Sequence, residues 1–398
     1  MTTHALTDTR GPVSVFADRV FGHLPRTDQR RWARAYLQGL LATSGKKSVR
    51  RIAAAFSDSP TASQSLHQFV NASPWDWIPA REELMRWAEH RVRPQAWTVD
   101  LAVLRKRGEH SCGVHRRFVP STGRSVTCQV GVGAFLAASD AVVPVDWRLL
   151  LPGSWAKDPQ RRRRARIPDD VDGRPIERHV LDLVDALTSA SRTAPVPVVA
   201  DLSTSPGAVG LVRGLVLRDC DFVVSVPDDF KVVLGRHLRV QRRSGPGEHG
   251  MALAARSLFQ FDAGGLFQLE TVPAGSGHRR GTTVMTSVVH LPMALPAGSQ
   301  PLRTYQLFTV RSAGDRRPPR LWLTTLTRAK AEERLALVRT LARTAESVRQ
   351  LEEGFGLLDF EGRSYPGWHH HMTLVSAAYA YSRLDGSGVR TRPLTAAA

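Results

Sequence analysis

The sequence predicts an α/β protein that begins with a helical domain. Three observations support this fold class. Apolar residues recur at helical spacing through residues 1–95. From residue 96 to about 227, short apolar runs alternate with amphipathic helices. Residues 228–300 are rich in glycine and contain only short β-like runs. We therefore expect a sheet covered by helices, with a β-rich insertion between its two parts.

The amino-terminal segment predicts four helices. In residues 28–41, Trp32, Ala35, Tyr36 and Leu40 share one helical face. Further helices are expected at residues 47–56, 63–69 and 81–90. A small basic helical module at the front of a basic protein suits DNA binding, and it equally suits a dimerisation cap.

The remaining elements follow from hydrophobic periodicity. Amphipathic patterns predict helices at residues 178–189, 208–217, 329–354 and 368–381. Apolar runs predict strands at residues 96–104, 126–136, 142–151, 196–202, 221–226, 231–234, 258–261, 283–291 and 321–326. The resulting domains are a helical domain (1–95), a core in two parts (96–227 and 301–386), a β-rich insertion (228–300) and a disordered tail (387–398).

Composition restricts the class of protein. The 398 residues contain 55 Lys and Arg against 36 Asp and Glu, giving a net charge of +19. The three cysteines form no CxxC pair, which argues against a disulfide scaffold and a zinc ribbon. With no apolar stretch of membrane-spanning length and no visible secretory signal, we expect a cytoplasmic globular protein. The charge predicts a polyanionic partner, and the alternative is an arginine-rich background composition.

Two aspartates occupy unusual places in this pattern. Asp100 lies in the middle of an apolar strand, and Asp201 lies at the end of another. A buried Asp is costly unless it is paired or holds a metal. Two such residues on adjacent strands, joined by an acidic residue on a late helix, can bind two Mg²⁺ ions for phosphodiester chemistry. The alternative is that each caps a turn or pairs with an arginine.

Other chemically capable residues have plainer interpretations. Residues 369–371 are three consecutive histidines, which point about 100° apart on a helix and cannot all bind one ion. We expect them to face DNA phosphates or the core. Trp147 and Trp155 suit base stacking, but packing is the simpler interpretation. The cysteines are expected to be buried and structural.

Four long segments resemble one family. They are GEHSCGVHRRFVPSTGRSVTCQVGVGAFLA (108–137), PVDWRLLLPGSWAKDPQRRRRARIPDD (144–170), VVADLS (198–203) and GLLDFEGRSYPGWHHHMTL (356–374). These stretches resemble the DDE insertion-sequence transposases of bacteria, in particular a branch common in actinobacteria. The resemblance covers roughly residues 25–385.

The resemblance implies a ribonuclease-H-like core with an inserted β domain and a helical DNA-binding amino terminus. It places the first two catalytic acids on Asp100 and Asp201. The third, on the long carboxy-terminal helix, is assigned to Glu346 because Arg343 precedes it by three residues. Glu352 and Glu353 remain rivals. This chain departs from the family where Leu-Ala-Val follows the first Asp and Ser-Thr-Ser-Pro follows the second.

The function implied is cut-and-paste DNA transposition, with two Mg²⁺ or Mn²⁺ ions held by the three acids. The expected partner is double-stranded DNA, both terminal inverted repeats and target, bound by a homodimer associated with the nucleoid. The alternatives are a degenerate, non-catalytic DNA-binding protein and a nuclease without strand transfer. Residues expected to contact DNA are Arg105, Lys106, Arg107, Arg116, Arg117, Arg161, Arg162, Arg163, Arg164 and Arg343.

Overall fold

The computed structural model describes residues 11–119, 123–234, 252–260, 268–272, 282–292, 303–312 and 319–385. The expected tail at 387–398 and much of the expected insertion lie outside these residues. No described helix is both long enough and apolar enough to cross a membrane.

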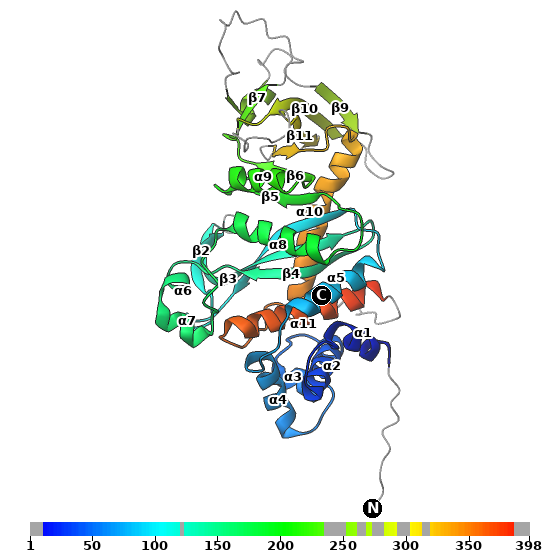
Figure 1. The fold of residues 1–398 in the computed structure, drawn as a ribbon, viewed down its shortest axis with the longest axis vertical. Helices are drawn as coiled ribbons and strands as arrows, with labels where there is room; N and C mark the ends of the chain where they lie inside the picture. Colours follow the sequence, from blue (N-terminus) through cyan, green and yellow to red (C-terminus); the bar gives the residue numbers. More distant parts are fainter. Residues whose placement is uncertain are drawn as a thin grey trace, which may run out of the picture.

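A mixed sheet organises the described chain and confirms the predicted α/β class (Figure 1). Its strand order is β2-β3-β1-β5-β6-β12-β11-β10-β7-β8, with β4 paired to β3 and β9 paired to β10. β3 is antiparallel to both β1 and β4, whereas β5 is parallel to both β1 and β6. The strands are β1 (Ala96–Arg105), β2 (His115–Val119), β3 (Arg124–Ala137), β4 (Val142–Leu149), β5 (Val198–Asp201), β6 (Phe222–Val226), β7 (Lys231–Leu234), β8 (Leu253–Ala254), β9 (Gln268–Val272), β10 (Thr282–His290), β11 (Tyr305–Ser312) and β12 (Leu321–Thr324).

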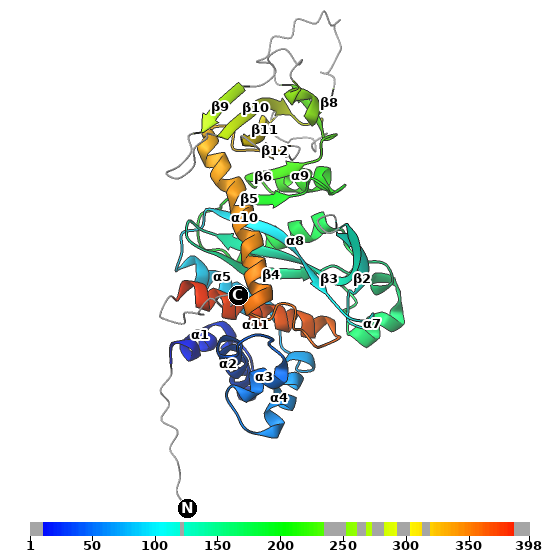
Figure 2. The ribbon, with the colours of Figure 1, turned by 180° about the vertical axis from the view of Figure 1, so that it is seen from behind.

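Helices cover both faces of this sheet. In Figure 1, α8 and α9 lie in front of the strands, and in Figure 2, seen from behind, α10 crosses in front of them. The helices α1 to α5 and α11 gather beyond the β4 edge. Their bounds are α1 (Pro12–Phe21), α2 (Thr27–Ala42), α3 (Val49–Ala54), α4 (Pro60–Asn71), α5 (Ile78–Glu89), α6 (Ser154–Lys157), α7 (Pro159–Ala165), α8 (Ile176–Ala190), α9 (Ala208–Leu217), α10 (Ala331–Gly354) and α11 (Tyr365–Leu384).

Helix α11 joins the amino-terminal helices to the sheet. It packs against α2, α4, α5 and β4, and nearly all of its side chains from Tyr365 to Tyr381 are buried. Ser364 caps its amino terminus by accepting a hydrogen bond from the Gly367 N–H. A helix buried on all sides belongs to the interior of the fold, so the core extends continuously from the sheet into the helical region.

Some elements differ from the sequence prediction. Residues 255–259 form a 3₁₀ helix where the expected strand at 258–261 begins. β11 was not expected, and it pairs with β10 on one side and β12 on the other. β10 and β11, which lie on either side of residue 300, therefore belong to the same sheet. The helices α1, α6 and α7 and the strands β2 and β9 also had no clear periodic signal.

Candidate active site

The two aspartates singled out in the sequence occupy neighbouring positions in the sheet. β1 and β5 pair in parallel with the register Trp97–Val198, Thr98–Val199 and Val99–Ala200. The next pair in this register is Asp100 and Asp201. Paired residues of parallel strands project from the same face, so both carboxylates leave the sheet on one side.

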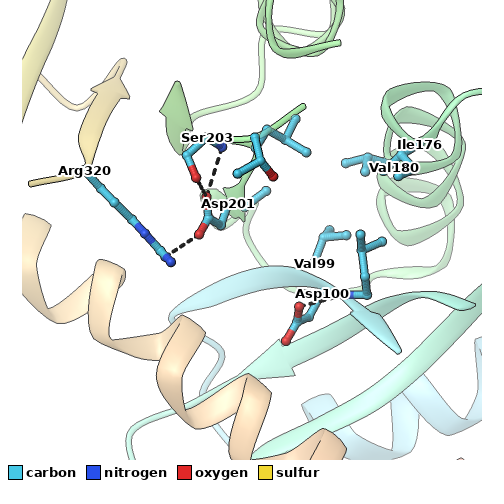
Figure 3. Close-up of a pocket in the computed structure, with 11 residues that line it drawn as sticks. Val99, Asp100, Ile176, Val180, Asp201, Ser203 and Arg320 are labelled. Atoms are coloured by element: carbon cyan, nitrogen blue, oxygen red, sulfur yellow. Dashed lines mark hydrogen bonds and ion pairs between the residues drawn. The ribbon is translucent and has the colours of Figure 1, made fainter. Parts of the chain in front are cut away.

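Both residues line a cavity of about 200 Å³, although the Asp100 carboxylate points away from Ile176 and Val180 (Figure 3). Ile176 and Val180 from α8 form an apolar wall, and Arg320, which immediately precedes β12, approaches from the other side. The remaining lining residues are Val99, Leu101, Ala200, Leu202, Ser203 and Thr204. The cavity therefore lies where β1 and β5 meet the first residues after β5.

Asp201 is held in its ionised form by directed donors. Its Oδ1 accepts hydrogen bonds from the Ser203 N–H (3.0 Å), from the Ser203 hydroxyl (2.8 Å) and from the Ser225 hydroxyl. Its Oδ2 accepts from the Arg320 guanidinium. Burial alone would raise the pKa of Asp201, but the bonds from Ser225 and Ser203, together with the Arg320 charge, hold that pKa below its usual value.

Asp100 has the opposite electrostatic setting. Burial raises its pKa to about 6, the Leu101 N–H opposes this by donating to Oδ1 at 2.7 Å, and the Asp201 charge adds to the rise. The Asp201 charge is the smallest of these three effects on the pKa of Asp100. A pair of carboxylates with pKa values pushed apart is a common mark of a functional site.

Comparison with known proteins agrees with this geometry. Residues 19–257, more than half of the chain, match the sequence model of a family described as DDE superfamily endonuclease. The chain belongs to the DDE endonuclease superfamily. The matched region contains Asp100 and Asp201 and ends before α10 begins. No curated protein sequence matches this chain significantly.

A solved structure is similar in a distant way. It is that of the piggyBac transposase synaptic complex with hairpin DNA, which is 10% identical to this endonuclease. The alignment has a TM-score of 0.40 and covers 97% of this chain and 68% of that chain. We draw neither fold nor function from so distant a likeness.

The structure does not bring Glu346 to the aspartate pair. Thr344 faces the sheet, where its hydroxyl lies 2.7 Å from that of Thr98 on β1. Glu346 follows Thr344 by two residues, about 200° around the helix, and so points away from the sheet. Its side chain is 44% exposed and is bound by Arg349 and Gln350.

The two rival glutamates also lie outside the cavity. Glu353 is exposed and pairs with Arg349. Glu352 is half-buried, and burial raises its pKa, with an opposing effect from Arg105 at the end of β1. Within the part of the chain that the structure describes, no group of three or more His, Cys, Asp or Glu side chains is arranged to hold a metal. The aspartate pair nevertheless supplies the hard oxygen donors that Mg²⁺ and Mn²⁺ prefer.

The residues expected to contact DNA divide into two groups. Three of them donate to backbone carbonyls within the fold: Lys106 to Phe360, Arg162 to Pro168 and Val171, and Arg343 to Ala138. Arg161 stacks on Trp155 and Arg117 is half-buried. The exposed members are Arg105, Arg107, Arg116, Arg163 and Arg164.

The histidines and tryptophans of the conspicuous motifs lie in the core. His369, His370 and His371 are each 1% exposed. Trp147 and Trp155 are also buried, and their indole N–H groups donate to the Ser376 hydroxyl and the Val114 carbonyl. Neither the histidines nor these two tryptophans are therefore exposed at the surface.

Sequence analysis missed Arg320, Ser203 and Ser225 as members of the site. Ser203 is detectable in principle, because a serine two residues after a strand-end Asp commonly bonds back to it. Ser225 and Arg320 carry no such local signal. They reach Asp201 only through the pairing of β5 with β6 and of β6 with β12.

Proposed function

We propose that this DDE endonuclease is a transposase that cuts transposon ends and joins them to target DNA with two divalent ions, Mg²⁺ or Mn²⁺. The observation that carries this proposal is the parallel register of β1 and β5, which ends at Val99 and Ala200 and, continued by one pair, sets Asp100 beside Asp201. The antiparallel strands β1, β3 and β4, followed by the parallel strands β5 and β6, support a ribonuclease-H-like core.

Asp100 and Asp201 would hold the ions. When bound, a divalent ion lowers the pKa of an attacking water and stabilises the leaving oxygen of the phosphodiester. The chain's own contribution is positional. Ser203 and Ser225 fix Oδ1 of Asp201, which leaves Oδ2, now bound by Arg320, as the oxygen that a cation would have to take. Ile176 and Val180 contribute the apolar α8 side of the cavity.

The contacts with DNA are proposed from charge and exposure. The net charge of +19 favours a polyanion, and the exposed arginines on β2 and α7 are free to contact phosphates. We also propose that the helices α1 to α5 bind DNA. The protein would act as a homodimer, with one active site for each transposon end. The third acidic ligand would be Glu346 or Glu352, after a rearrangement of α10, or a group supplied with the DNA.

A second candidate is a non-catalytic DNA-binding protein derived from a transposase. Two observations favour it. Among the described residues that line the cavity, the only acids are Asp100 and Asp201, and Asp201 is already paired with Arg320. Such a protein would keep the basic surface and lose the cleavage reaction.

Nicking of a supercoiled plasmid in Mn²⁺ separates the two candidates. The transposase proposal predicts nicking by the wild type that is lost in both Asp100→Asn and Asp201→Asn, with DNA affinity retained. Asp140→Asn, at an exposed aspartate between β3 and β4, is the matched control and should cut normally. If the purified wild type binds the plasmid but never nicks it, the non-catalytic candidate replaces the transposase.

A further inference from the structure

Arg320 occupies the open side of Asp201. Oδ1 of Asp201 already accepts three hydrogen bonds, from the Ser203 N–H, the Ser203 hydroxyl and the Ser225 hydroxyl. A carboxylate offers about four acceptor positions in all, so Oδ1 has no room for a further ligand. Oδ2 is the remaining oxygen, and the Arg320 guanidinium donates to it. A cation that binds Asp201 must therefore compete with Arg320.

The backbone of Arg320 is fixed while its head group is not. The Arg320 carbonyl accepts a hydrogen bond of 2.9 Å from the Thr309 hydroxyl on β11. Because β6 lies between β12 and β5, the side chain spans two inter-strand spacings, about 9–10 Å, to reach Asp201. Figure 3 shows it extended across this gap. Among the described residues, the guanidinium is therefore held at the end of a long side chain by one acidic partner, Asp201.

The ion pair between Arg320 and Asp201 is partly exposed, so another cation can replace Arg320 in it. The Arg320 side chain is 58% exposed and that of Asp201 is 28% exposed. Exposed pairs contribute little free energy, because water and salt screen them. A divalent cation bound between two carboxylates carries twice the charge of a guanidinium. Once displaced, the guanidinium stays beside the cavity, and its planar fork of donors suits phosphate oxygens.

We infer that Arg320 and a divalent cation exclude each other at Asp201, and that the displaced Arg320 then binds a DNA phosphate at the same site. The inference rests on the proposed function, since it requires that Asp201 bind a cation. In the absence of cation Arg320 neutralises Asp201, and in its presence Arg320 becomes a contact for the substrate. Binding of cation and binding of DNA thereby reinforce each other.

The mutual exclusion of Arg320 and the cation is tested by Mn²⁺ binding in the absence of DNA. Electron paramagnetic resonance measures the free Mn²⁺. We expect Arg320→Gln to bind Mn²⁺ roughly three- to tenfold more tightly than the wild type, because one positive charge has left the site. Arg328→Gln, at an exposed arginine beyond the other end of β12, should bind like the wild type. Asp201→Asn should lose the site, and melting curves should show that every variant is folded.

Two results have different meanings. If Arg320→Gln binds Mn²⁺ no more tightly than the wild type at an Asp201-dependent site, the exclusion is wrong while the metal site stands. If neither protein has an Asp201-dependent site, the proposed function fails together with the inference.

The contact between the displaced Arg320 and a DNA phosphate is tested by the affinity for a short random-sequence DNA duplex, measured with and without Ca²⁺. In the wild type, Ca²⁺ should strengthen DNA binding, and Arg320→Gln should lose most of that gain while Arg328→Gln keeps it. An equal gain in wild type and Arg320→Gln would overturn the phosphate contact.

Discussion

Asp100 on β1 and Asp201 on β5 are register neighbours on parallel strands, and they lie in opposite electrostatic states. Hydrogen bonds and Arg320 hold the pKa of Asp201 low, whereas burial raises the pKa of Asp100 to about 6. One carboxylate is thus permanently charged near neutral pH, and the other is close to its titration point. A bound cation would be a positive partner for the Asp100 carboxylate and would therefore favour its ionised form.

The buried ion pair of Arg81 and Asp146 should be a main support of the fold. The Arg81 guanidinium on α5 donates to Asp146 at 2.7 Å and also to Thr373 and His369 on α11. Arg81→Met should lower the free energy of unfolding by about 3 kcal/mol or more, because it breaks a buried ion pair and removes the charged donor that ties α5 to β4 and α11. Urea denaturation measures this. Arg93→Met, at an exposed arginine, should change it by less than about 0.5 kcal/mol, and equal losses would contradict the assignment.

Gly133 should not tolerate a side chain. It is the register partner of Asp100 on β3, and a Cβ built there would lie 2.6 Å from the Trp147 ring and 2.9 Å from that of Phe135. Gly133→Ala should therefore destabilise the protein by about 1–3 kcal/mol through overpacking. Gly354→Ala, where a Cβ meets nothing within 4 Å, is the control and should show no loss in the same thermal melts. A fully stable Gly133→Ala would show that the Trp147 packing is wrong.

The buried histidines should make the protein sensitive to acid. Burial lowers the pKa of His179 and of His370 to about 4 and that of His371 to about 3, below the ordinary 6.5. In the unfolded chain these residues bind protons near pH 6.5, so stability is complete above that pH and is lost as the pH falls toward 4. Each contributes a slope of up to about 1.4 kcal/mol per pH unit.

His179 offers the cleanest test of this slope. Neither of its ring nitrogens has a hydrogen-bond partner among the described residues. His179→Leu therefore removes the titratable imidazole without breaking a hydrogen bond. We expect the variant to lose less stability than the wild type between pH 6.5 and 4.5 in parallel urea titrations. Identical pH profiles would mean that His179 is not buried as described.

Glu346 should be dispensable for metal binding in the free protein. Its carboxylate is bound by Arg349 on the face of α10 turned away from the sheet. Glu346→Gln should therefore leave Mn²⁺ affinity unchanged, whereas Asp100→Asn should reduce it at least about tenfold through loss of a charged ligand. A tenfold loss in Glu346→Gln would instead mean that α10 rearranges to bring this residue to the site, as the family resemblance implies.

The elements that sequence predicted well are those with strong periodicity. The apolar runs of β1, β3, β5 and β6 reflect strands buried on both faces, and α8 and α9 carry clear amphipathic patterns. Asp100 and Asp201 were visible because a carboxylate is conspicuous in such a run. Short or irregular pieces such as α6, α7 and β2 carry too few residues to show a period.

The sequence could not show which residues far apart in the chain contact one another in the fold. Arg320 is one arginine among many, and only the order β5-β6-β12 directs it to Asp201. The histidines of α11 resemble a polar surface, yet Trp75 and Trp77 stack on His370 and His369 and bury them. Glu346 matches a family spacing, but its direction depends on how α10 is rotated on the sheet, which Thr98 and Thr344 set through their contact.

The most direct test of the central claim is anomalous diffraction from crystals soaked in Mn²⁺. The claim is that Asp100 and Asp201 form one divalent-cation site. It predicts an anomalous peak in contact with both carboxylates, with Arg320 moved away from Oδ2 of Asp201, and no such peak in Asp201→Asn. Saturating Mn²⁺ that leaves the pair empty, with Arg320 still bound to Asp201, would contradict the claim.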